Sequence, residues 1–183
     1  DASALADLRV LAAAFGLALQ RLGERSPEAL DALCRLLLFP AGLPERTAML
    51  VAGGVHSVGL QHLYDRRLVD WRDGRVHVPL LLQGGAFVAP ADGAAHRAAF
   101  EQATIGLTMH VHACADQRLQ GDFVFATARL IAEERNLDAL ETYVRAHVTS
   151  DSVLPFARLV EPITPVLLFF GRLELALRIA LTG

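Results

Sequence analysis

The densest group of residues able to do chemistry is His110, His112 and Cys114, which occupy alternate positions. On a β-strand this spacing would place three metal ligands on one side, as a zinc site requires. The surrounding apolar pattern is helical, however. On a helix His110 and Cys114 share a face while His112 points elsewhere. We therefore expect ordinary helix residues here and no metal site.

A second candidate group consists of carboxylates. They are Glu133, Glu134, Asp138 and Glu141. Paired carboxylates can serve as general acid and base. Arginines at positions 129, 135 and 145 are interleaved with them. This mixture of charges favours a solvated helix face held by ion pairs.

Signs of catalysis are weak elsewhere. Ser57 lies near His56 and His62 but lacks the Gly-x-Ser-x-Gly turn that exposes a nucleophilic serine. All 17 basic residues are arginine, which excludes Schiff-base chemistry and the phosphate-binding lysine of a Walker A loop. We expect neither an enzyme nor a resident cofactor.

Composition narrows the class of protein. The formal net charge of -3 disfavours a general electrostatic binder of nucleic acid. Cys34 and Cys114 lie far apart, as expected for buried thiols in a reducing cytoplasm. No apolar run approaches the ~20 residues of a membrane span. The chain starts at Asp1 without an initiator methionine or a signal-peptide pattern, so we expect a piece of a longer protein.

Apolar residues recur every three or four positions through most of the chain, which is typical of amphipathic helices. Ser26-Pro27 provides a cap and a proline at the first position of one of them. In chain order the predicted helices cover residues 5–22, 28–38, 44–53, 56–66, 94–118 and 123–144, then one that begins after Asp151-Ser152 and is kinked or divided by Pro162 and Pro165, and finally 173–181.

One segment follows a two-residue period. Leu68–Arg72 and Arg75–Val78 alternate like strands and flank Asp73-Gly74, a pair that favours a tight hairpin turn. Three helices followed by a hairpin is the order of a winged helix-turn-helix, with its wing at Trp71–Val78. The predicted fold is mainly α: a winged helix-turn-helix domain over 1–89, then helical hairpins like a tetratricopeptide solenoid over 90–183.

Four short motifs occur in an order that resembles the winged-helix region and first helical repeats of bacterial signal-transducing ATPases with numerous domains (STAND proteins). They are Leu-Leu-Leu-Phe-Pro-Ala-Gly at 36–42, the leucine pattern ending in Leu-Val at 60–69, Asn-Leu-Asp-Ala-Leu at 136–140, and Gly-Arg-Leu-Glu-Leu-Ala-Leu at 171–177. The similarity covers most of the chain.

This resemblance implies a regulatory segment that couples a nucleotide-binding core, located elsewhere, to a helical sensor array. Its partners would be adjacent domains of the parent protein or another protein. In the family a histidine just after the wing can contact the nucleotide. Here His77 is the nearest candidate, and an equally fair alignment places Pro79 there.

Two other functions stay open. Arg66, Arg67, Arg72 and Arg75 could carry a DNA-binding winged helix with a helical dimerisation or effector domain. Alternatively, a small helical enzyme or ligand-binding protein would have a polar pocket near His110, His112 or His147. An exposed apolar surface along 166–170 and 173–181 would favour the coupling segment instead, because a truncated solenoid leaves its next interface open.

Overall fold

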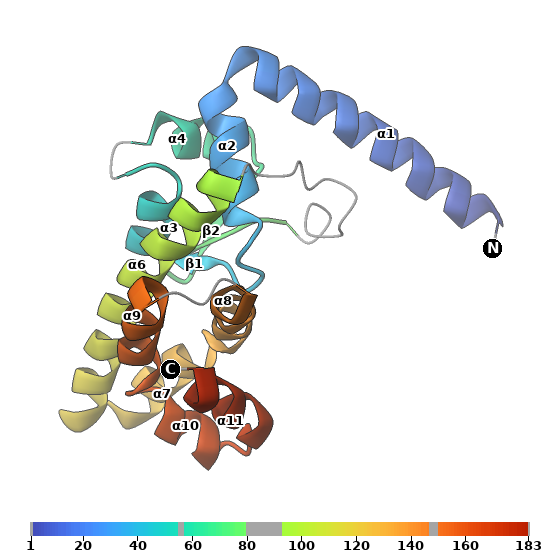
Figure 1. Cartoon of the computed structure of the whole chain (residues 1–183). Coiled ribbons are helices and arrows are strands. Elements are labelled where there is room, and N and C mark those ends of the chain that lie inside the picture. Colours follow the sequence, from blue (N-terminus) through green and yellow to red (C-terminus); the bar gives the residue numbers. More distant parts are fainter. Residues whose placement is uncertain (1, 55–56, 80–92, 147–149, 183) are drawn as a thin grey trace.

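The computed structural model describes residues 2–54, 57–79, 93–146 and 150–182. This part of the chain is mainly helical and contains one small antiparallel sheet (Figure 1). Residues 80–92, as well as His56 and His147, lie outside the described residues.

Two helices form the N-terminal end. α1 (Ala2–Arg25) projects away from the rest of the molecule, and Leu22 near its end is buried (Figure 1). α2 (Pro27–Leu36) begins with the predicted proline, but the Ser26 side chain at the preceding position makes no capping hydrogen bond. Its most deeply buried residues are Ala29, Ala32, Leu33 and Leu36. They follow the three- and four-residue spacing that places one helix face in a core.

Two short helices and three strands follow. They are β1 (Leu43–Pro44), α3 (Glu45–Val51), α4 (Val58–Asp65), β2 (Asp70–Arg72) and β3 (Arg75–His77). Gly53 and Gly54 have positive φ, as expected beyond a helix end. Ser57 caps α4 by accepting a hydrogen bond from Leu60 N at 3.2 Å.

The predicted hairpin is confirmed. β2 and β3 are antiparallel, and the two residues between them have φ of 53° (Asp73) and 70° (Gly74). Positive φ at both positions is the requirement of a type I′ turn. β1, which the sequence did not predict, adds to the other edge of β3, so the sheet order is β1-β3-β2. A two-residue strand containing proline has no period of its own, and its pairing depends on β3.

The second half consists of helices. They are α6 (Gly93–Leu119), α7 (Phe123–Ile131), α8 (Glu134–Ala146), α9 (Ser150–Val160), α10 (Thr164–Phe169) and α11 (Leu173–Thr182). The division before Pro165 is confirmed. The single helix predicted over 123–144 is wrong, because it breaks between α7 and α8. At this break Glu133 N donates to the carbonyl of Leu130 rather than to that of Arg129.

α6 is the element that unites the two halves, since it packs against α3 on one side and against α7 and α9 on the other (Figure 1). Its contact with α3 is close: a Cβ added to Gly106 would lie 2.7 Å from Thr47 Oγ1. Buried residues from α1 to α11 form one continuous core. Within the described ranges, no helix combines the length and apolar character that crossing a membrane requires.

Candidate functional site

A buried ion pair joins β3 to the break between α7 and α8. The Glu133 side chain is fully buried and that of Arg75 is 13% exposed. Arg75 Nη1 donates to Glu133 Oε1, and Arg75 Nη2 donates to Glu133 Oε2 at 3.1 Å. Because two parallel hydrogen bonds fix the orientation of both groups, this pair ties the hairpin to the helices.

Asn136 and Gly42 complete an arrangement that we call the polar joint (Gly42, Arg75, Glu133 and Asn136). Asn136 Nδ2 donates to Glu133 Oε2 at 2.8 Å and to Gly42 O at 2.7 Å. Asn136 Oδ1 accepts from Ala41 N at 3.3 Å, and Arg75 Nη2 also donates to Gly42 O at 2.9 Å. These bonds offset the cost of removing the charges from water.

Glycine is the only residue type that fits at position 42 of the polar joint. Its φ is 68°, and a Cβ there would lie 2.6 Å from both His77 Nδ1 and Val76 O. Contacts this short are not made by real Cβ atoms. The Phe-Pro-Ala-Gly segment therefore ends in glycine because β3 and the joint approach its backbone.

His110 and Cys114 lie beside the joint. His110 Nε2 is 3.5 Å from Glu133 Oε1 and 3.7 Å from Cys114 Sγ. Burial lowers the pKa of His110 and raises the pKa of Cys114. A catalytic cysteine needs a lowered pKa and a base oriented through its other ring nitrogen. Here the carboxylate and the thiol approach the same nitrogen, so the pair lacks that arrangement.

His112 does not join the other two residues of the His-x-His-x-Cys motif. It is exposed, with Nε2 3.3 Å from the carbonyl of Arg158. Among the residues described, no group of three or more histidines, cysteines or carboxylates is placed to hold a metal ion.

The four arginines considered for DNA binding differ in their surroundings. Arg66 and Arg67 are exposed at the end of α4. Arg72 is exposed and pairs with Asp70 at 2.7 Å. The guanidinium group of Arg75 is inside the polar joint, so the four do not form one exposed cationic surface.

His77, the candidate nucleotide contact, is half-buried on β3 next to Gly42. Its pKa is lowered, first by burial and then by the neighbouring charges of Arg75 and Arg72. A neutral imidazole beside the joint is compatible with hydrogen bonding to a ligand. The role of His77 as a nucleotide contact stays a prediction.

The expectation of a solvated carboxylate face is wrong for two of its residues. Glu133 is fully buried and Glu141 is 2% exposed. Arg145 Nε donates to Glu141 Oε1 at 2.8 Å. A signal for Glu133 existed in the sequence: it follows Leu130 by three positions and precedes Leu137 by four, and both leucines are fully buried. The mixture of charges around Glu133 indicated a solvated helix face instead, so its burial was not predicted.

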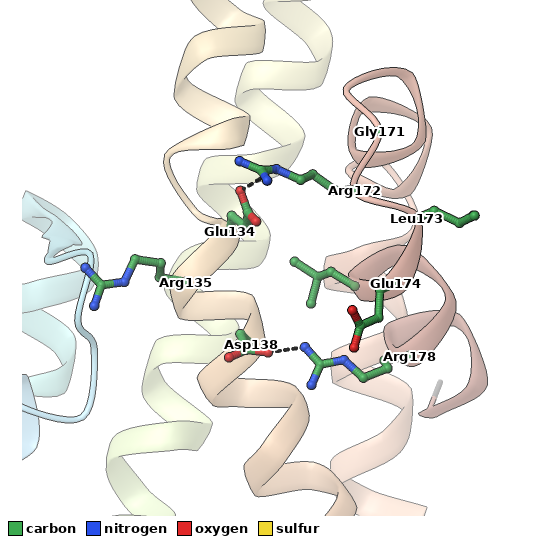
Figure 2. Close-up of a pocket in the computed structure, with 9 residues that line it drawn as sticks. Glu134, Arg135, Asp138, Gly171, Arg172, Leu173, Glu174 and Arg178 are labelled. Carbon is green, nitrogen blue, oxygen red and sulfur yellow. Dashed lines mark hydrogen bonds and ion pairs between the residues drawn. The ribbon is translucent and has the colours of Figure 1, made fainter.

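A cavity of about 360 Å³ lies between α8 and α11. Two ion pairs span it, Arg172 Nε to Glu134 Oε2 at 3.1 Å and Arg178 to Asp138 (Figure 2). Figure 2 also shows Leu173 pointing away from the cavity and Arg135 extending to the opposite side of α8. These two ion pairs thus hold the α10–α11 hairpin on α8.

Comparisons with protein families, with curated proteins and with solved structures found no match for this chain.

Proposed function

We propose that the chain is a non-catalytic regulatory and scaffolding segment of a multidomain STAND-type signalling ATPase. It couples a nucleotide-binding core to a helical sensor array through protein–protein contacts. The polar joint is the observation that carries this proposal. Because Arg75 of the hairpin is bonded to Glu133 and, with Asn136, to Gly42, a displacement of the hairpin is transmitted to α7 and α8.

The order of elements supports a winged-helix identity for the first half. α2, β1, α3, α4, β2 and β3 follow the helix-strand-helix-helix-hairpin sequence of that module, and β3 lies between β1 and β2. α4 corresponds to the helix that would enter a DNA groove. Its outward residues include Tyr64, which is 50% exposed, and an aromatic ring suits contact with protein better than contact with base edges.

Two equivalent turns support a helical repeat for the second half. Gly121 and Gly171 both have positive φ and both end a helix. The next residue donates to a carbonyl five positions earlier in each case, Asp122 N to Gln117 O and Arg172 N to Leu167 O. Five residues beyond each glycine lies a buried alanine. This hydrogen bond is that of the Schellman motif, which ends α6 and α10 and leads directly into two similar helices, α7 and α11.

Exposed apolar residues on α10 and α11 fit an interface with a following helical hairpin. They are Leu168, Phe169, Phe170, Leu173, Leu177 and Leu181, with exposed fractions between 48% and 85%. The predicted surface along 166–170 and 173–181 is therefore apolar and exposed, although Val166 and Leu167 are buried. Such a surface favours the coupling segment over a self-contained regulator.

The test uses the full-length product of the gene. Its sequence is expected to contain Walker A and Walker B motifs outside this segment. Replacing Arg75 by alanine should change the equilibrium affinity for ADP by about fivefold or more, the lower range of allosteric coupling. Arg72→Ala, which removes an exposed pair on the same hairpin, should leave that affinity unchanged. A product without Walker motifs, or an unchanged affinity in Arg75→Ala, would overturn the proposal.

A DNA-binding winged-helix regulator is the alternative, favoured by the exposed Arg66, Arg67 and Arg72. A fluorescence-anisotropy titration with mixed-sequence duplex DNA at several salt concentrations separates the two functions. Micromolar binding with a steep salt dependence, lost in the triple alanine variant of these arginines, would establish the alternative.

A further inference from the structure

A small notch lies where α4 meets the hairpin, and neither the polar joint nor the cavity beside α8 includes it. Its lining residues are Met49, Ser57, Leu60, Gln61, Tyr64 and Trp71, and its volume is about 120 Å³. Tyr64 and Trp71 meet edge to face, with ring centroids 6.2 Å apart. Their rings form two walls of a recess on the outer side of the sheet-bearing half.

The notch favours an apolar occupant, because the hydroxyl of Ser57 and the amide nitrogen of Gln61 already have partners and no lining residue is charged. Ser57 Oγ donates to Ala52 O at 2.7 Å and accepts from Leu60 N. Gln61 Nε2 donates to Asp65 Oδ1 at 2.9 Å. No charged residue lines the recess. A phosphate or a metal ion would therefore lose its hydration there without replacement.

Size restricts the occupant further. A volume of about 120 Å³ is a little below the ~150 Å³ of an apolar cavity that accommodates a benzene molecule. The four-carbon side chain of a leucine has this size. Tyrosine and tryptophan are also the residue types that most often dominate protein–protein binding energy.

The charged residues near the notch indicate which residues would flank a leucine-sized side chain of a bound partner. Arg66 and Arg67 directly follow the end of α4, are exposed, and form no ion pair with any described residue. Arg67 N donates to the carbonyl of Tyr64, so the backbone that carries these two cations is held next to the backbone of Tyr64. Carboxylates are their natural partners.

From these features we propose that the notch binds a protein segment in which one leucine-sized apolar side chain is followed by acidic residues. The apolar side chain fills the recess between Tyr64 and Trp71, and the carboxylates pair with Arg66 and Arg67. This inference deepens the proposed function by naming the chemistry of a protein partner. It does not need the nucleotide-binding core, so its test can fail independently.

The probe is a phage-displayed library of random twelve-residue peptides, selected on the chain and counter-selected on Tyr64→Ala. Enriched peptides should share one leucine, isoleucine or valine near aspartates or glutamates. Synthetic copies should change the fluorescence of Trp71, the only tryptophan in the sequence. Replacing the apolar anchor by alanine should weaken binding by about tenfold or more.

Variants of the chain separate the notch from the general surface. Tyr64→Ala should weaken peptide binding about as much as replacing the peptide's apolar anchor by alanine. Tyr64→Phe keeps the aromatic ring and should therefore retain peptide binding. Val58→Ala is the matched control: Val58 is 60% exposed on the same helix but does not line the notch. Replacing Arg66 and Arg67 by alanine should weaken binding and reduce its salt dependence.

Three results would overturn the inference. The first is a selection that yields no shared apolar-acidic pattern. The second is equal peptide affinity of the wild type and a folded Tyr64→Ala, with folding verified by circular dichroism. The third is displacement of the peptides by mixed-sequence duplex DNA, which would assign this face to nucleic acid.

Discussion

At the scale of single residues, the polar joint concentrates the consequences of substitution. Glu133 is buried among cationic and amide donors. Removing one partner of such a pair leaves an uncompensated buried charge, which costs more than the pair itself contributes. The same reasoning does not apply to Arg72 and Asp70, whose pair is largely in water.

Arg75→Ala should therefore lower the free energy of unfolding by about 3–5 kcal/mol, and Arg72→Ala by at most ~1 kcal/mol. Urea unfolding followed by circular dichroism measures both values. Losses of similar size in the two variants would show that the Arg75–Glu133 pair contributes no more than a surface contact.

His110 links stability to pH. Its pKa is lowered by burial, with Glu133 opposing the shift and Arg129 and Arg75 adding to it. The folded state therefore binds a proton less readily than the unfolded state, whose histidines titrate near pH ~6.5. Stability is complete above this pH and falls as the pH decreases below it.

Replacement of His110 by glutamine should reduce that acid-side loss. As the pH decreases from 8 to 5, the urea midpoint should fall less steeply for His110→Gln than for the wild type. His77 should account for part of the remaining decrease, because its pKa is also lowered. Parallel curves for the two proteins would contradict a contribution from His110.

At the scale of elements, the two Schellman turns carry the repeated pattern of the helical half. Gly121 has φ of 105° and Gly171 of 73°, and a Cβ at either would meet no atom within 4 Å. Steric clashes with neighbours are thus absent, and only the backbone conformation opposes a side chain.

Gly121→Ala and Gly171→Ala should each lower the free energy of unfolding by about 1–2 kcal/mol. Gly16→Ala is the control, because Gly16 lies within α1 with equal space around it. The free energy of unfolding of Gly16→Ala should not decrease and should rise by up to ~1 kcal/mol. Clearly unequal losses at the two turns would argue against their equivalence.

At the scale of the whole molecule, one core runs from α1 to α11, while large apolar side chains stay exposed on α10 and α11. Phe169 is 77% exposed and Leu181 is 85% exposed. Water contact with such a surface is unfavourable, so the surface should associate with other apolar surfaces when no partner is present.

The chain alone should therefore self-associate with increasing concentration. The double variant Phe169→Ser with Leu173→Ser should reduce this self-association without lowering stability. The control variant Val58→Ser on α4 should leave the self-association unchanged. Sedimentation velocity over a concentration series measures the effect. Association that persists unchanged in the double variant would place the contact elsewhere.

The sequence by itself determined the features that depend on neighbouring residues. Asp73-Gly74 requires a tight turn, Ser26-Pro27 starts a helix, and Pro162 with Pro165 ends one, because each limits the backbone locally. Amphipathic spacing likewise predicted most of the helices.

Tertiary structure alone decided the rest. β1 exists because β3 pairs with it, and only folding brings Arg75, far away in the sequence, to Glu133 as its counter-charge. Asn136 and Gly42 acquire their roles from the same meeting of hairpin and helices. Burial of a charge depends on a partner brought close by folding, and local spacing contains no record of that partner.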